Sequence, residues 1–211
     1  MSQDKIIKKL QSQAERMHEK EPAYKRYMNL EMLVLLVFAI LIAISCNTFL
    51  FRIIRVDGPS MLPTFVTDQR VFVDRVTYKV THPKRYDVII CYYNHNGRLI
   101  KGDDPVIKRV IGLENETIEI KDGVILINGN ELDESYYWDD LINNDMDEYT
   151  IPPGSIFVVG DNRNNSLDSR DKSIREVPYK NIVGMVRARI WPVQDFTFFN
   201  YNSIRAEVLG K

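Results

Sequence analysis

Cysteine and histidine are both scarce in this chain, whose 211 residues include two cysteines and three histidines. Cys46 lies in an apolar run and Cys91 in an expected strand, which argues against a disulfide framework. Neither cysteine belongs to a C-x-x-C pair, and the histidines lack the spacing of metal ligands. We therefore expect no metal ion and no other cofactor.

A net charge of either sign is also missing, because 28 Lys and Arg residues face 29 Asp and Glu residues. Without a basic excess there is no argument for nucleic-acid binding, and without an acidic excess there is none for disorder. The length suits one folded domain with an appendage.

Residues 32–51 contain no charged side chain. As a helix rising about 1.5 Å per residue, this run would cover roughly 30 Å, the thickness of the hydrocarbon core of a bilayer. The run is apolar all round, which favours a single transmembrane helix over a buried core helix. A cleaved signal peptide is the other alternative, since Ala43 and Ser45 precede Cys46. The run is too long for one, however, and continues past the candidate cleavage site.

The N-terminal segment, residues 1–31, is hydrophilic. Its apolar residues at helical spacing fit either a short amphipathic helix on a membrane surface or a solvated tail. They are Ile6, Leu10, Ala14 and Met17. Basic residues are denser before the apolar run than after it. The positive-inside rule therefore predicts residues 1–31 in the cytoplasm and residues 52–211 outside.

Residues 52–211 are predicted to form a mainly β domain with antiparallel sheets. Seven short segments are rich in β-branched residues and bounded by turn residues. They are residues 70–74, 87–93, 106–111, 117–121, 124–128, 155–159 and 182–191. Asp122-Gly123 and Asn128-Gly129 are typical of tight turns, so residues 113–153 are expected to form a hairpin-built insertion on the main sheet. Within it, the acidic and aromatic residues 133–149 are expected to form a loop or a solvated helix.

Ser60 lies in the segment 56–65, shortly after the apolar run. Pro59 and Pro63 each fix their own φ and restrict the preceding residue, which stiffens the backbone on both sides of the Ser60 hydroxyl. Gly-Pro-Ser is also ordinary turn chemistry, so this segment by itself does not identify a nucleophile.

Lys108 shares one face of an expected strand with Val106 and Val110. Such neighbours would desolvate the amine and lower its pKa, as a general base requires. A lysine that pairs with a carboxylate or extends to solvent is the structural alternative. His82 and His95 lie in turn-like settings, which leaves a serine with a desolvated lysine as the supported arrangement for nucleophilic catalysis.

The segment 160–170 is dense in residues that form turns and bond their own backbone. Asp168 and Arg170 could pair to hold it in shape, and Ser166 could offer a hydroxyl to a neighbour. Arg163 occupies what would be a ligand position in a calcium loop, and the segment lacks the glycine pattern of a phosphate-binding loop.

Four motifs follow the apolar run in order: Gly58-Pro-Ser60-Met-x-Pro-Thr64, Tyr86-Asp-Val88, Ile107-Lys108-Arg-Val-Ile-Gly112, and Gly160-Asp-Asn-Arg-x-Asn-Ser166-x-Asp168-Ser-Arg170. Together they resemble the motifs of the bacterial type I signal peptidases, over essentially all of residues 52–211. The resemblance implies a membrane-anchored serine endopeptidase of the bacterial cell membrane. Such an enzyme cleaves N-terminal signal peptides from secreted preproteins after a small residue, through an acyl-enzyme.

The resemblance also implies roles for individual residues. Ser60 would be the nucleophile, Lys108 the general base and Ser166 the group that orients the Lys108 amine, while Asp168 and Arg170 would form a structural ion pair. The substrate would bind as an added strand between residues 53–59 and 104–107. The residues expected to contact it are Ile53, Ile54, Val56, Asp57, Pro105, Val106 and Ile107. The expected partners are signal peptides of secretory preproteins and the lipid bilayer, with the translocation machinery as a further candidate and no nucleic acid.

Three positions depart from the family pattern. Gly58 stands where some members carry a hydroxyl residue that helps bind the oxyanion, so the oxyanion hole is expected to use the Ser60 amide with a contribution from Gly58. Asn164 replaces a common aspartate, and residues 112–116 replace a Gly-x-Pro-Gly-Asp segment. Both are expected to alter local packing without loss of activity.

Two other functions fit the same residues. One is a specialised peptidase of narrow substrate range, of the pilin or conjugation type. The other is a catalytically silent, chaperone-like relative on the membrane, against which the presence of both Ser60 and Lys108 argues.

Overall fold

The computed structural model describes residues 3–45, 49–95, 98–99, 105–134 and 141–209. The chain divides into two compact units, residues 1–48 and 49–211. Each unit is described by itself.

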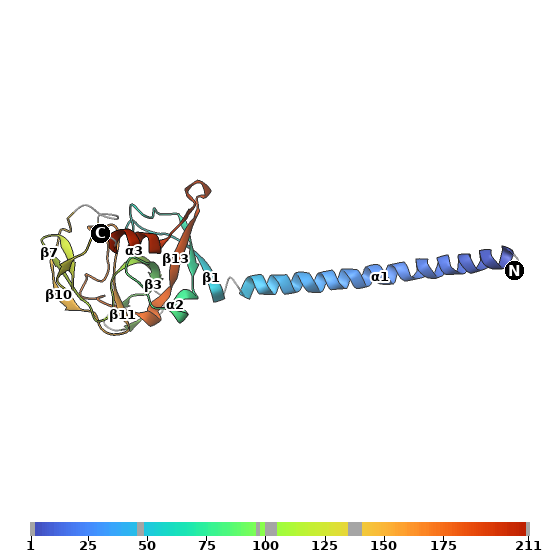
Figure 1. Ribbon diagram of the computed structural model, residues 1–211, viewed down its shortest axis with the longest axis horizontal. Coiled ribbons are helices and arrows are strands. Elements are labelled where there is room, and N and C mark those ends of the chain that lie inside the picture. The colour runs from blue at the N-terminus through green and yellow to red at the C-terminus, as the bar shows by residue number, and fades with distance from the viewer. Residues whose placement is uncertain (1–2, 46–48, 96–97, 100–104, 135–140, 210–211) are drawn as a thin grey trace. The chain divides into compact units, whose positions relative to one another are not determined.

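The N-terminal unit is one helix, α1, which spans Gln3–Ser45 (Figure 1). The helix is therefore longer than the short amphipathic helix that was expected. The alternative of a frayed tail is wrong for residues 3–31, although the side chains of residues 5–16 are exposed. Among the described residues, no helix combines the length and the apolar character needed to cross a membrane. A helix was also expected over residues 32–51, but Phe51 is the first residue of a strand, so this prediction is wrong at Phe51. Residues 46–48 of the same prediction lie outside the described ranges. An apolar run does not distinguish helix from strand, and here the Phe51 ring packs 4.9 Å from that of Phe72, on the neighbouring strand.

The second unit is built on an antiparallel sheet with the strand order β1-β2-β13-β3-β6-β11-β12, in which β14 also pairs with β13. Its strands are β1 Phe51–Arg55, β2 Arg70–Asp74, β3 Val88–Cys91, β6 Val106–Gly112, β11 Ser155–Val159, β12 Val177–Pro178, β13 Ile182–Trp191 and β14 Thr197–Phe198. The long strand β13 lies beside β3 (Figure 1). The predicted mainly β, antiparallel fold is confirmed.

A smaller antiparallel sheet lies within residues 113–153 and has the order β10-β7-β8-β9. Its strands are β7 Thr117–Lys121, β8 Val124–Ile127, β9 Asn130–Glu131 and β10 Met146–Thr150. Both expected turns form: Asp122 and Gly123 have φ values of 53° and 82°, and Asn128 and Gly129 of 51° and 75°. Such positive φ values at both central residues match the right-handed twist of a hairpin.

Strand β10 contradicts the expectation of a loop or solvated helix at its residues. It pairs with β7 because Met146 and Tyr149 turn toward the apolar core of this sheet, while Asp147 and Glu148 stay exposed. Residues 135–140 of that expectation lie outside the described ranges.

The remaining elements are short. They are α2 Thr77–Val80, β4 Asn94–His95, β5 Arg98–Leu99, the 3-10 turns η2 Tyr179–Asn181 and η3 Val193–Asp195, and α3 Tyr201–Leu209. The helix α3 was not expected from the sequence. It is held by long-range contacts, since the Tyr201 hydroxyl donates to the Val186 carbonyl at 2.8 Å and Arg205 pairs with Asp87 at 2.7 Å.

Strand β6 is the structural centre of this unit. Six of its seven residues are buried, and Ile107, Val110 and Ile111 belong to three different apolar clusters. Burying one such side chain stabilises a fold by about 1.5–3 kcal/mol, so β6 is anchored from several sides. Any side chain that β6 carries is thereby held in a rigid setting.

Candidate active site

The segment that carries Ser60 is fixed by its apolar residues. Met61 and Phe65 are fully buried, and the Phe65 amide donates to the Met61 carbonyl at 2.8 Å. Gly58 has a φ of +88°, a conformation that side-chain-bearing residues rarely adopt, and it turns the chain ahead of Pro59. The half-buried Ser60 hydroxyl is therefore held by a constrained loop.

Lys108 reaches this hydroxyl from β6. Its residue pairs with Ile89 of β3, its side chain is 3 % exposed, and its Nζ donates to the Ser60 Oγ at 2.7 Å. The two residues lie 48 positions apart in the chain. The structure thus brings together the two groups expected to act as nucleophile and base.

Burial lowers the pKa of the Lys108 amine from its ordinary value of 10.5. Asp168, Cys91 and Asp161 oppose this shift, and Arg170 adds to it. Burial is the largest contribution, because it disfavours the charged ammonium. The direction is the one that makes a neutral, proton-accepting amine more abundant.

The loop 160–170 is tied to the Ser60 segment. The Asn162 amide donates to the Ser60 carbonyl at 3.0 Å, and the Asn162 Nδ2 donates to the Pro59 carbonyl at 3.1 Å. A Cβ atom placed on Gly160 would collide with the Ser60 carbonyl and with the Ser166 side chain. Only glycine leaves room for this close approach.

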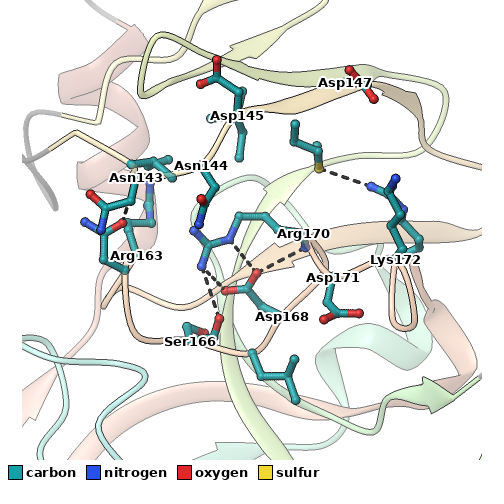
Figure 2. Close-up of a pocket in the computed structure, with 16 residues that line it drawn as sticks. Asn143, Asn144, Asp145, Asp147, Arg163, Ser166, Asp168, Arg170, Asp171 and Lys172 are labelled. Atoms are coloured by element: carbon teal, nitrogen blue, oxygen red, sulfur yellow. Dashed lines mark hydrogen bonds and ion pairs between the residues drawn. The ribbon is translucent and has the colours of Figure 1, made fainter.

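Asp168 and Arg170 form the expected ion pair. The Arg170 Nε and Nη2 atoms each donate to the Asp168 carboxylate at 2.8 Å (dashed lines in Figure 2). The buried carboxylate also accepts the Gly160 amide at 3.0 Å. This pair therefore holds the loop at the point where it passes Ser60. It also borders a cavity of about 420 Å³ whose lining carries charges of both signs (Figure 2).

Ser166 does not meet Lys108 as expected. Its hydroxyl oxygen is buried and, within the described part of the chain, makes no hydrogen bond. The side chain instead lies against Gly160, while the Lys108 amine is directed at Ser60. The structure brings Ser166 close to the site but does not pair it with the base.

Sequence reasoning missed the pair of Arg109 and Asp161. The guanidinium donates through Nε and Nη2 to the Asp161 carboxylate at 2.7 and 2.6 Å, and both side chains are almost fully buried. The Thr64 hydroxyl donates to the same carboxylate at 2.5 Å. Asp161 therefore joins the strand of the lysine to the segment of the serine. An arginine in an apolar strand was the available signal, since a buried cation requires a partner.

A groove of about 460 Å³ opens beside the two reactive groups. Ser60 and Lys108 line it together with the seven residues expected to contact the substrate, with Val71 and Ile90 also in its wall. On one side, β1 is the terminal strand of the sheet. On the other side of the groove, β11 pairs with β6 only from Arg109 to Gly112. The edge of β6 at Val106 and Ile107 is therefore not paired with β11. Two open strand edges facing a groove can accept an extended peptide. Asp104 of the second expected edge lies outside the described residues.

The oxyanion hole was expected to use the Ser60 amide. Within the described residues this amide makes no hydrogen bond, so it is available as a donor. Pro59 has no N–H, and the space around the Gly58 Cα is open. Among these same described residues, no group of three or more Cys, His, Asp or Glu side chains is arranged to hold a metal ion.

Asn164 bridges two segments of the chain. Its Nδ2 donates to the Leu141 carbonyl at 3.1 Å, and its Oδ1 accepts the Asn143 amide at 2.9 Å. An amide can donate and accept in this way, whereas an ionised aspartate is acceptor-only. The asparagine thus links the loop 160–170 to the chain between β9 and β10.

We expect Asn164→Asp to lower the free energy of unfolding by about 1 kcal/mol, the typical value of one hydrogen bond. The reason is the lost donor to Leu141. Chemical denaturation monitored by circular dichroism measures the change, with the neighbouring exposed Asn165→Asp as the control. Equal effects at both positions would show that the added charge, and not the bridge, is responsible.

The fold and the site together define a class: an antiparallel β domain in which a loop serine meets a buried strand lysine beside an open groove. A model of the family described as "Signal peptidase, peptidase S26" matches residues 29–191. The signal peptidase I of Bacillus caldolyticus is 34% identical over 173 residues, covering 76% of this chain and 90% of that protein. The signal peptidase I of Bacillus licheniformis is 30% identical over 202 residues, covering 90% and 98% of the two chains.

The chain belongs to the signal peptidase family, peptidase S26. A crystal structure of a signal peptidase I from Enterococcus faecalis V583 shares 30% sequence identity and covers 50% of this chain and 97% of its own, with a TM-score of 0.40.

Proposed function

We propose that this chain is a serine endopeptidase that removes N-terminal signal peptides from secreted preproteins, with Ser60 as nucleophile and Lys108 as general base. The observation that carries the proposal is the 2.7 Å approach of the Lys108 Nζ to the Ser60 Oγ, from a lysine that is 3 % exposed. Family membership supports the substrate class, since the matched family is one of signal peptidases.

In the first half of the reaction, neutral Lys108 accepts the Ser60 proton as Oγ attacks the carbonyl carbon of the scissile bond. The developing oxyanion accepts a hydrogen bond from the Ser60 amide, and Gly58 contributes to stabilising it. Lys108 then returns the proton to the leaving nitrogen as the carbon–nitrogen bond breaks. The products of this half are the new N-terminus and an ester between Ser60 and the signal peptide.

In the second half, Lys108 accepts a proton from a water molecule that attacks the ester carbonyl. The carbon–oxygen bond to Ser60 breaks, and Oγ recovers the proton from Lys108. The signal peptide leaves with a free carboxylate, and the enzyme returns to its starting state.

The groove accounts for an extended substrate with small side chains. A peptide between β1 and Val106–Ile107 can form backbone hydrogen bonds on both edges. Val71 and Ile90 line the groove together with Ser60. We expect their branched side chains to favour small substrate residues at the positions that face them.

We further propose that residues 32–51 attach the chain to the bacterial cell membrane, with residues 1–31 in the cytoplasm and the catalytic unit outside. The absence of charge over this run supports the proposal, as do the exposed apolar side chains that α1 presents from Met32 to Ile44. Alkaline extraction of cell membranes tests attachment, and protease accessibility of intact protoplasts tests the orientation. Release of the full chain by alkali would contradict attachment.

The function is tested by incubating the purified full chain with a preprotein and sequencing the N-terminus of the product. We expect one cut, after a small residue that has another small residue two positions before it. Cuts at many sites, or an uncut preprotein in the presence of folded enzyme, would contradict the proposal.

The activity is expected to decline as the pH falls through the lowered pKa of Lys108, because the ammonium cannot accept the Ser60 proton. The pH profile of kcat/KM on a signal-peptide substrate measures this decline. A rate that stays flat between about pH 5 and 9 would contradict a lysine base.

The same shift predicts a pH dependence of stability. The unfolded chain binds the Lys108 proton more tightly than the folded chain, so the free energy of unfolding should rise with pH between the lowered pKa and 10.5. A Lys108→Met variant should lose this contribution.

A further inference from the structure

A second cavity in the unit 49–211, of about 290 Å³, is strongly basic. Four of its lining residues are cationic: Arg52, Arg75, Lys79 and Lys180. Three others are the tyrosines Tyr78, Tyr92 and Tyr179. Within the described ranges, no aspartate or glutamate lines this cavity, which we call the basic pocket.

The carboxylates nearest to the basic pocket already have partners. Asp74 accepts the Val76 amide, the Thr77 hydroxyl and the Arg187 guanidinium. Asp87 accepts the Tyr78 hydroxyl at 2.8 Å and pairs with Arg205 at 2.7 Å. These contacts engage both carboxylates with groups other than Lys79 and Lys180.

A third carboxylate, that of Glu114, lies beside Tyr179. It accepts the Gly154 amide at 2.7 Å. Burial, followed by the neighbouring Glu114 carboxylate, raises the pKa of Tyr179 to about 12. That phenol therefore keeps its proton at neutral pH. By contrast, Arg52, Lys79 and Lys180 form no ion pair with a carboxylate in the described part of the chain, and both lysines are exposed.

This combination suits an anion with several oxygen acceptors. Arginine and lysine bind phosphate oxygens through charge-assisted hydrogen bonds, and tyrosine hydroxyls add neutral donors. A volume of about 290 Å³ admits a phosphodiester with a small polar substituent. The chemistry of the lining thus favours an anionic phosphate group over a neutral or cationic ligand.

The place of Arg52 in the chain indicates the source of that phosphate. Arg52 directly follows Phe51, the last residue of the charge-free run, and it lines both the basic pocket and the substrate groove. Helix α1 ends at Ser45, seven positions before Arg52, so the chain holds Arg52 within roughly 25 Å of the end of that helix. If residues 32–45 lie in a bilayer, the phosphates within that reach are those of the phospholipid headgroups.

We propose that the basic pocket binds the phosphate headgroup of an anionic phospholipid, and that this contact holds the adjacent end of the substrate groove at the membrane surface. The proposal rests on the membrane attachment proposed above. It concerns Lys79 and Lys180, which take no part in the chemistry at Ser60.

Native mass spectrometry of the full chain in a neutral detergent tests the site, with phosphatidylglycerol and phosphatidylcholine as probes. Each basic side chain near an anionic headgroup contributes roughly a fivefold factor in affinity. We therefore expect Lys79→Gln/Lys180→Gln to reduce phosphatidylglycerol binding about 30-fold. Phosphatidylcholine binding, which reports on the apolar segment, should not change. Lys79→Arg/Lys180→Arg should retain the preference.

The matched control is Lys121→Gln/Lys172→Gln, which removes the same charge from exposed positions outside the pocket. We expect it to change phosphatidylglycerol binding less than about threefold, because solvent and salt screen distant charges. Equal loss in both double variants, or no preference of the wild type for phosphatidylglycerol, would overturn the proposal. Competition by inorganic phosphate as effective as that by the lipid would assign the pocket to a soluble anion and overturn the lipid source.

Cleavage of a soluble signal-peptide substrate, in detergent without phospholipid, separates this proposal from the proposed function. Both lysine double variants should cleave within about twofold of wild type, since neither touches the Ser60 site. If the wild type cleaves the substrate but does not prefer phosphatidylglycerol, the proposal for the basic pocket is wrong and the proposed function still stands.

Discussion

Alanine at either Ser60 or Lys108 is expected to reduce kcat/KM for preprotein cleavage by roughly 10⁴- to 10⁶-fold. Without the hydroxyl no acyl-enzyme forms, and without the amine nothing accepts the hydroxyl proton. Because the two groups act as one unit, the double variant should be no less active than the worse single variant. Single-turnover cleavage of a signal-peptide substrate by the full chain measures these effects.

Two controls make this result specific. Lys121→Ala removes an exposed strand lysine and should leave kcat/KM unchanged within about twofold. Lys108→Met keeps the length of the side chain without its desolvated amine, so it should abolish activity without lowering the unfolding temperature. A variant at Ser60 or Lys108 that still processes a preprotein at the wild-type rate would refute the assignment.

Among the substitutions discussed for their effect on stability, the removal of Asp161 is expected to lower the free energy of unfolding most. In Asp161→Ala, the Arg109 guanidinium keeps its buried position but loses its carboxylate, which costs about 3–5 kcal/mol of unfolding free energy. The variant should also lose most of its activity, since Thr64 and Arg109 then no longer link the serine segment to β6. Urea denaturation followed by far-UV circular dichroism measures the stability change.

The exposed pair of Arg55 and Asp68 provides the matched control. Its side chains are 69 % and 67 % exposed, so Asp68→Ala should cost at most about 1 kcal/mol. If both variants lose a similarly small amount of unfolding free energy, the buried pair of Arg109 and Asp161 does not stabilise the fold as expected. A double change, Arg109→Met with Asp161→Leu, should regain much of the stability but not the activity, because the bond to Thr64 remains absent.

Seven of the strands were predictable because their signals are local. The segments 70–74, 117–121 and 155–159 match β2, β7 and β11 to the residue, since β-branched runs end at turn residues in each case. The two hairpin turns of the smaller sheet were predictable for the same reason, as Asp-Gly and Asn-Gly tolerate positive φ.

The failed predictions depend on distant partners. Strand β10 carries the acidic residues Asp147 and Glu148 in a pattern that does not indicate a strand, and it forms because β7 offers an edge to it. Helix α3 has a weak apolar periodicity of its own. It is stabilised by contacts of Tyr201 with β13 and of Arg205 with Asp87. Context of this kind outweighs local preference.

The family position of Ser166 also did not determine its contact. The expected hydrogen bond to Lys108 requires the loop 160–170 to place the hydroxyl toward β6. In this structure the side chain packs on Gly160 instead. The orientation of this side chain is set by the packing of the loop, and sequence carries no signal for such a choice.

By itself, the sequence determined seven strand segments, a serine held between two prolines and a lysine within an apolar strand, because these are properties of neighbouring residues. Only the tertiary structure decided that the Lys108 Nζ lies 2.7 Å from the Ser60 Oγ, and that Arg109, one residue further on, faces Asp161 instead. The two contacts join residues 48 and 52 positions apart. Distances of this kind follow from how β6 is packed among three apolar clusters, and no local pattern in the chain contains that information.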